Sequence, residues 1–115
     1  MIEITRGDTM VLKFQRKDKD GNVITQKADE IFFTVKVNAF LDNYIFQKKL
    51  NSGITFNNED YYYRITILPT DTEGLYYGTY KYDIEVKNGN DYVCTIDIGD
   101  FIVKEEVTFA RNEVE

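Results

Sequence analysis

A turn followed by strand-like alternation in the middle of the chain constrains the fold most. Residues 69–72 read Pro-Thr-Asp-Thr, which is typical of a turn or a single helical turn. After Gly78, large apolar residues occupy every second position: Tyr80, Tyr82, Ile84 and Val86. A period of two places such side chains on one face of a β-strand. We therefore expect a turn that leads into a half-buried strand, with Tyr80 and Tyr82 in the core.

The same alternation recurs in short segments along the whole chain. Further strands are expected at residues 2–5, 10–15, 30–38, 44–50, 54–56, 61–67 and 92–103. Asn88-Gly89 favours a tight hairpin between the last two long strands, because both residues tolerate positive φ. No segment of ten residues has helical periodicity. The pattern predicts an all-β fold, an immunoglobulin-like antiparallel β-sandwich of about seven to nine strands.

Alternation also assigns individual side chains. It places Tyr61 and Tyr63 in the core, and Cys94 inside as a small buried hydrophobe. Gly99 is expected to mark a bulge or bend before the end of the last strand. Lys48 and Lys49 indicate an edge strand, since edge lysines oppose pairing with other chains.

Length and charge limit the class of protein. The chain has 115 residues, which suits one domain at residues 1–109 with a charged tail at 110–115. The net charge of -6 repels phosphate backbones, so no nucleic-acid partner is expected. The first residues lack a cationic region followed by an apolar stretch, and we expect no signal peptide. No apolar run is long enough to span a membrane.

Residue types that carry chemistry are scarce. The chain has no His and one Cys, which removes the commonest general base and the usual zinc ligands. Carboxylates are plentiful, but Asp71 and Glu73 lie in the turn, and Asp83 lies on the polar face of the following strand. We interpret them as structural, against a remote glycosidase alternative. The sequence predicts a protein that is not an enzyme and needs no metal or cofactor.

Two short motifs have both a functional and a structural interpretation. Residues 18–22 (DKDGN) resemble part of a calcium loop, but Gly21 comes too early for the EF-hand spacing, and a hairpin turn is preferred. Arg6-Gly7-Asp8 is the tripeptide that integrins read in extracellular ligands. Here the structural interpretation is preferred: Gly7 supplies an unusual φ, and Asp8 bonds to nearby backbone.

The tyrosines are the remaining candidates for a site. Tyr62 points away from the expected core, and at least one of Tyr76 and Tyr77 is expected to stay exposed. Tyrosine offers rigid contact area with a polar tip, which suits protein or sugar binding. The predicted interaction surface consists of Tyr62, Tyr76, Tyr77, Lys48 and Lys49. For the tyrosines as a group, core or cross-strand packing is the preferred interpretation.

Several separated segments together resemble a known family. They are residues 4–9 (ITRGDT), 69–72 (PTDT), 78–84 (GTYKYDI), 95–101 (TIDIGDF) and 107–108 (VT). In this order they are similar to small β-sandwich proteins encoded in phage structural regions. They resemble in particular the N-terminal domain of phage baseplate upper proteins, which hold receptor-binding proteins in a tail tip. The resemblance implies no catalytic residues.

The resemblance implies a non-enzymatic phage or prophage structural module, in the tail or baseplate, that acts through protein–protein contact. Its expected partners are other phage structural proteins or itself, and its expected location is the virion, after synthesis in the bacterial host cytoplasm. Baseplate upper proteins continue beyond this domain, whereas this sequence stops at Glu115, so a stand-alone component is an equal expectation. The alternative is a carbohydrate-binding or adhesion module that binds a glycan through exposed tyrosines.

Overall fold

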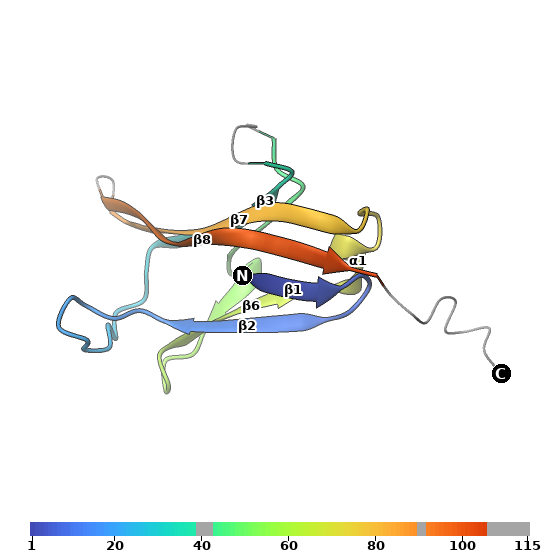
Figure 1. Ribbon diagram of the computed structural model, residues 1–115. Coiled ribbons are helices and arrows are strands. Elements are labelled where there is room, and N and C mark those ends of the chain that lie inside the picture. Colours follow the sequence, from blue (N-terminus) through green and yellow to red (C-terminus); the bar gives the residue numbers. More distant parts are fainter. Residues whose placement is uncertain (39–42, 90–91, 106–115) are drawn as a thin grey trace.

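The computed structural model describes residues 1–38, 43–89 and 92–105 (Figure 1). The described residues form eight strands and one short helix. The elements are β1 (Ile2–Thr5), β2 (Met10–Gln15), β3 (Glu30–Lys36), β4 (Phe46–Leu50), β5 (Gly53–Phe56), β6 (Tyr62–Ile67), α1 (Pro69–Thr72), β7 (Gly78–Asn88) and β8 (Tyr92–Lys104). The turn or single helical turn expected from Pro69 onward is present as α1. The expected tail at residues 110–115 lies outside the described residues.

The strands form one mixed sheet in the order β1-β8-β7-β3-β4-β5-β6-β2, curled until it nearly closes into a barrel. Figure 1 shows β3, β7 and β8 in one layer, β2 and β6 in the other, and β1 between them. The all-β class and the number of strands are therefore confirmed. The purely antiparallel arrangement is wrong, because β1 runs parallel to β8 and β4 runs parallel to β5.

The junction between β4 and β5 explains why the layers belong to one sheet. Asn51 and Gly53 adopt positive φ of 69° and 98°, and Lys49 and Ser52 exchange backbone hydrogen bonds of 2.9 and 2.8 Å. The chain thus bends sharply from one layer into the other instead of making a hairpin. A Cβ on Gly53 would lie 2.7 Å from Cδ of Lys48, so glycine is required here for space as well as for φ.

The position of β4 corrects one expectation. This strand lies between β3 and β5, and the edge strands are β1 and β2. The prediction that Lys48 and Lys49 mark an edge is therefore wrong. Lys48 lies on the inward face of β4 between Phe46 and Leu50, where its aliphatic stem packs against Gly53.

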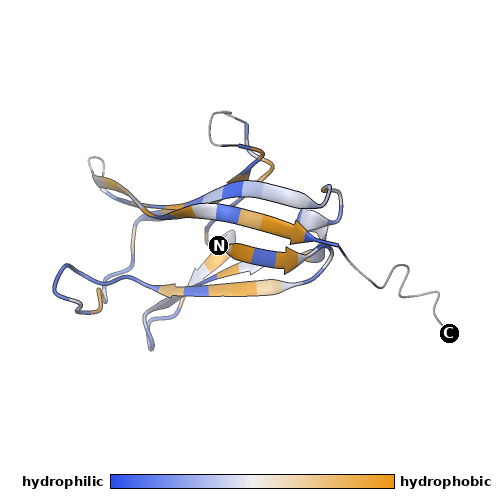
Figure 2. Cartoon of the chain, in the orientation of Figure 1, coloured by the Kyte–Doolittle hydropathy of each residue, from blue (hydrophilic) through white to orange (hydrophobic). Residues whose placement is uncertain are grey.

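The core fills the space between the two layers. Fully buried side chains come from both layers and include Phe33, Ile54, Tyr63, Ile65, Ile67 and Phe101. The Phe101 ring lies 6.3 Å from the Phe33 ring and 5.8 Å from the Phe46 ring. Figure 2 shows hydrophobic stretches interrupted by hydrophilic positions along β1, β2 and β8. Aromatic ring contacts thus connect β3, β4 and β8 within the core.

The tyrosine assignments are mostly correct. Tyr63 is fully buried and Tyr82 is 4% exposed, as expected, while Tyr80 is half-buried against the core. The expectation for Tyr61 is wrong. It precedes β6 with a φ of 62°, and its N–H donates to the carbonyl oxygen of Asn57. The turn therefore takes Tyr61 out of the alternating pattern.

The bulge in β8 lies at Ile96 and not at Gly99. Ile84 pairs with Asp97 and Glu85 pairs with Thr95, which leaves Ile96 without a partner in the register. Gly99 instead lies opposite Tyr82, where an added Cβ would lie 3.3 Å from the ring. The absence of a side chain at Gly99 thus leaves room for the ring of Tyr82.

Candidate functional site

The sequence-predicted tyrosines do not gather on one surface. Tyr76 and Tyr77 lie in the loop between α1 and β7, and Tyr76 is 87% exposed. Tyr62 opens β6, whose far end leads into α1. The six residues of β6 separate the two positions by roughly 17 Å. The structure therefore brings Tyr76 and Tyr77 together but leaves Tyr62 apart from them.

Each of two tyrosine rings is paired with a cation. The guanidinium carbon of Arg6 lies 4.4 Å from the ring centre of Tyr77, and the ammonium of Lys13 lies 4.9 Å from that of Tyr62. Both contacts occupy part of a ring face that a sugar would need. Tyr76 is the member of the set that is fully open to solvent.

The two lysines of the predicted surface have different surroundings. Lys49 is exposed, which is compatible with its place on the predicted interaction surface. The Nζ of Lys48 lies 2.7 Å from Oδ2 of Asp71, and the two side chains are only 13% and 15% exposed. The same Asp71 oxygen accepts the N–H of Leu68 at 2.7 Å. The charge of Lys48 is therefore neutralised by Asp71 of α1, and the role of Lys48 as an interaction residue stays a prediction.

The Arg6-Gly7-Asp8 turn lies at the end of the barrel where α1 lies, which we call the closed end (Figure 1). Gly7 has a φ of 85°, as predicted, and its N–H donates to Oγ1 of the buried Thr72 at 2.9 Å. Arg6 donates from Nη1 to the carbonyl oxygen of Leu75 at 3.2 Å. These bonds attach the turn to α1 and to the loop after it. They support the structural interpretation of the tripeptide.

Residues 18–22 form the predicted hairpin turn. Oδ1 of Asp18 accepts the N–H groups of Asp20 and Asn22, both at 2.9 Å, and Gly21 has a φ of 85°. One carboxylate oxygen thus satisfies two backbone donors. In the described part of the chain, no group of three or more Cys, Asp or Glu residues is arranged to hold a metal ion.

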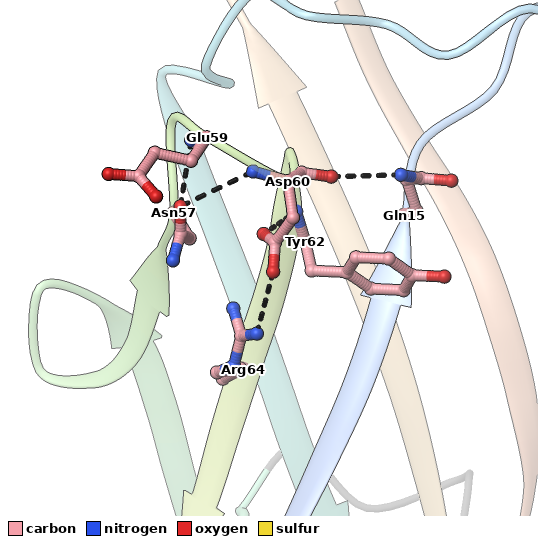
Figure 3. A network of polar contacts seen from close by, with 6 residues as sticks. All are labelled: Gln15, Asn57, Glu59, Asp60, Tyr62 and Arg64. Carbon is pink, nitrogen blue, oxygen red and sulfur yellow. Dashed lines mark hydrogen bonds and ion pairs between the residues drawn. The ribbon is translucent and has the colours of Figure 1, made fainter.

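A polar network organises the turn between β5 and β6 (Figure 3). Oδ1 of Asn57 accepts the N–H groups of Glu59 and Asp60, and Gln15 donates to the carbonyl oxygen of Asp60 at 3.0 Å. Arg64 lies 2.8 Å from Oδ2 of Asp60. This bond, followed by the N–H of Tyr62, lowers the pKa of the Asp60 carboxyl below its usual value.

The same network borders a broad hollow of about 750 Å³, which also contacts Thr25, Lys27 and Phe56. Asp60 and Arg64 are bonded to each other and to the turn that carries them. We therefore interpret the network as the support of the hairpin and not as a reactive site.

A different surface, which sequence reasoning missed, lies at the open end of the barrel. Residues 93–100 of β8 have β7 on one side, but among the described residues no strand pairs with their other edge. A cavity of about 400 Å³ separates this edge from residues 14–17 at the end of β2. We call this edge, residues 14–17 and the cavity between them the seam.

The seam has mixed apolar and polar walls. Its cavity is lined by Phe14, Gln15, Arg16, Lys17, Ile24, Ile84, Val86, Cys94, Ile96 and Asp97. Cys94 is half-buried here, so its expected full burial is wrong. Ile96 and Ile98 of the same strand are exposed, Ile98 by 69%. The change of apolar positions from even numbers (94, 96, 98) to odd numbers (101, 103) was the available sequence signal for this surface.

At the seam, Tyr82 and Asp97 form a polar pair. The Tyr82 hydroxyl donates to Oδ2 of Asp97 at 2.8 Å. Burial of the ring, together with this hydrogen bond and the charge of Asp97, raises the pKa of Tyr82 to about 12. The phenol is therefore a hydrogen-bond donor throughout the physiological pH range.

No described helix has the length and apolar character needed to cross a bilayer. Comparison with known proteins identified no relationship: no family model and no curated protein matches this sequence.

Proposed function

We propose that this chain is a non-enzymatic structural or assembly module of a phage or prophage, placed in the tail or baseplate and acting by protein–protein contact. One observation carries the proposal: a length of β8 that no described strand pairs on its outer edge, with exposed apolar side chains, borders an open cavity. Free strand edges are a common means by which one chain adds to another. The resemblance of residues 4–9, 69–72, 78–84 and 95–101 to baseplate upper proteins supplies the phage setting.

The arrangement of charged groups supports a binding role over catalysis. Asp71 is ion-paired to Lys48, and Asp60 is bonded to Arg64, so both carboxylates stabilise the fold. The proposal includes no metal and no cofactor. It also includes location in the virion, after synthesis in the host cytoplasm, and partners among other structural proteins.

The immunoglobulin-like sandwich expected from the sequence is part of this proposal as well. The two layers seen in Figure 1 support it. The β4–β5 bend distinguishes this fold from a sandwich of two separate sheets, because it joins both layers in one sheet.

The second candidate is a carbohydrate-binding or adhesion module. The 87% exposure of Tyr76, next to Tyr77, favours it, because a solvent-exposed tyrosine can stack on a sugar ring. Glycan binding at Tyr76 would use a surface far from Tyr62. Replacement of Tyr76 by Ala would abolish glycan binding in this case and leave contacts at the seam intact.

Sedimentation velocity tests the proposal. The chain is measured alone and then mixed with the purified products of its neighbouring genes. We expect a larger complex with a tail or baseplate protein, no binding on a glycan array, and equal melting temperatures with and without a chelator. Specific glycan binding that is lost in Tyr76→Ala, without any complex with a tail or baseplate protein, would contradict the proposal.

A further inference from the structure

We propose that the seam is a strand-addition site that receives residues 106–115 of a second copy of this chain. The inference deepens the proposed function, on which it rests, because it names a second copy as one of the protein partners. The contact would place the incoming segment end to end with β1 along the free edge of β8.

The free edge of β8 is long enough for a specific contact. β8 has 13 residues, and β7 pairs with it along its length, whereas β1 pairs only with the four residues from Phe101 to Lys104. The outer edge of residues 93–100 therefore offers backbone N–H and C=O groups that no described strand uses. An extended segment can satisfy these groups and bury its alternate side chains.

The cavity provides the space for those side chains. Its apolar wall consists of Phe14, Ile24, Ile84, Val86, Cys94 and Ile96. With a volume of about 400 Å³, it has room for more than one apolar side chain between β2 and β8. The bulge at Ile96 places that side chain on the cavity wall, next to the free edge.

Residues 106–115 have a sequence suited to this cavity. They read EVTFARNEVE, in which Val107 and Phe109 are two residues apart and thus share one face of an extended strand. The segment is also acidic, with three Glu residues and one Arg. Val107 and Phe109 would enter the cavity, while the carboxylates would remain at its rim.

The charge of the rim complements this segment. Arg16 and Lys17 line the cavity, and in the described part of the chain neither forms an ion pair. Arg16 donates from Nη1 only to the carbonyl oxygen of Gln26, at 3.3 Å. Two cations without carboxylate partners would attract an acidic segment and disfavour a basic one.

Geometry requires that the segment come from another copy. Cys94 and Lys104 are ten residues apart on one extended strand, which corresponds to roughly 33 Å. Phe109 is five residues beyond Lys104 and can reach at most about 17 Å from it. Val107 and Phe109 therefore cannot enter the cavity of their own molecule beside Cys94.

The contact would be heterologous, because the tail of one copy meets the seam of the next. Such contacts generate a closed ring when the rotation between copies closes, and a filament when it does not. Both forms suit a module that works in repeated copies.

The sharpest test separates the two halves of the contact. An acceptor variant, Ile96→Asp, places a carboxylate on the cavity wall, and a donor variant ends after Glu105. The matched control, Val37→Asp, places the same charge on another exposed apolar residue, which follows β3 and lies outside the seam. Sedimentation across a concentration series should show association for the wild-type chain and for the control, and monomers for either variant alone.

Mixing the two variants completes this test. The shortened chain retains an intact seam, and Ile96→Asp retains an intact tail, so a one-to-one complex should form only in the mixture. A synthetic peptide of residues 105–115 should bind to the shortened chain, and Ile96→Asp in that background should weaken binding by about tenfold or more. Circular dichroism of each variant confirms that the fold is retained.

Three results would overturn the inference: a wild-type chain that stays monomeric at every concentration, a shortened chain that still associates, or equal losses in Ile96→Asp and Val37→Asp. Disulfide trapping provides an independent readout. In Phe109→Cys, mild oxidation should link the new thiol to Cys94 of another copy, and the link should disappear in the Cys94→Ser background. Monomers that still bind a tail or baseplate protein would refute this inference and leave the proposed function standing.

Discussion

The two parts of β8 differ in their surroundings although they belong to one strand. At residues 101–104, β8 lies between β7 and β1, and its inward side chains Phe101 and Val103 are fully or nearly fully buried. At residues 93–100 it has one neighbour among the described strands, and Ile96 and Ile98 are exposed. A strand paired on both edges is part of the scaffold, whereas a strand paired on one edge is available to a partner.

Polar contacts reinforce this difference between the two ends of the barrel. The closed end combines the Gly7–Thr72 and Arg6–Leu75 hydrogen bonds with the Lys48–Asp71 ion pair. The open end has the cavity and the Tyr82–Asp97 hydrogen bond. Stability should therefore depend mainly on the closed end, and binding on the open end.

Removing a large side chain from each part of β8 tests the contrast between the two parts most strongly. Phe101→Ala should lower the free energy of unfolding by about 3–5 kcal/mol, because it leaves a cavity against Phe33 and Phe46. Ile98→Ala should change it by less than about 0.5 kcal/mol, since that side chain is mostly in water. Urea denaturation measures both values, and equal losses would show that the two parts contribute alike.

Ion pairs give a second contrast. Asp71→Ala should lower the free energy of unfolding by about 2–4 kcal/mol. The substitution leaves the Lys48 ammonium without a partner in a place that is largely shielded from water. The exposed Lys81–Asp100 pair joins β7 and β8, and Asp100→Ala should cost about 0–1 kcal/mol. Adding Lys48→Met to Asp71→Ala should restore part of the loss. If the double variant were no more stable than the single one, the unpaired ammonium would not be the cause.

Alkaline unfolding tests the polar pair at the open end. The pKa of Tyr82 is about 12 in the folded chain and about 10 when unfolded. Between these pH values the unfolded chain loses the proton first, so stability falls as pH rises. Tyr82 should contribute a loss of up to about 2–3 kcal/mol across this range, and Tyr82→Phe should lose correspondingly less. Thermal melts of both proteins from pH 9 to pH 12 measure the difference, and parallel curves would argue against this assignment.

The smallest expected effect concerns the turn at the closed end. Thr72→Val keeps the shape of the side chain but removes the acceptor of the Gly7 N–H, which should cost about 1–2 kcal/mol. Thr95→Val is the control, because Thr95 is exposed on β8 and its hydroxyl makes no hydrogen bond within the described residues. A loss in the control as large as that in Thr72→Val would remove the distinction between the two ends.

Alternation along the chain predicted much of the local structure. It identified the strands, the burial of Tyr63 and Tyr82, and the helical turn before β7. Local turn chemistry also predicted the positive φ of Gly7. These features depend on neighbouring residues, so a single sequence contains the information needed for them.

Within the predicted interaction surface, Tyr76 and Lys49 are exposed, and their role in binding stays a prediction. Lys48 looked like an edge residue because its partner, Asp71, is 23 residues away in the sequence. No periodicity indicates that α1 would cover the inward face of β4. The separation of Tyr62 from Tyr76 likewise depends on the direction of β6 in the folded molecule.

Alternation in the sequence is enough to specify an all-β protein and the inward face of most strands, because a two-residue period is a property of the backbone. The parallel pairing of β1 with β8, the bend at Gly53, and the edge of residues 93–100 that no described strand pairs become visible only in the folded molecule. Strand pairing joins residues far apart in the chain, and the same alternating pattern is compatible with many pairings. The seam follows from that choice of partners.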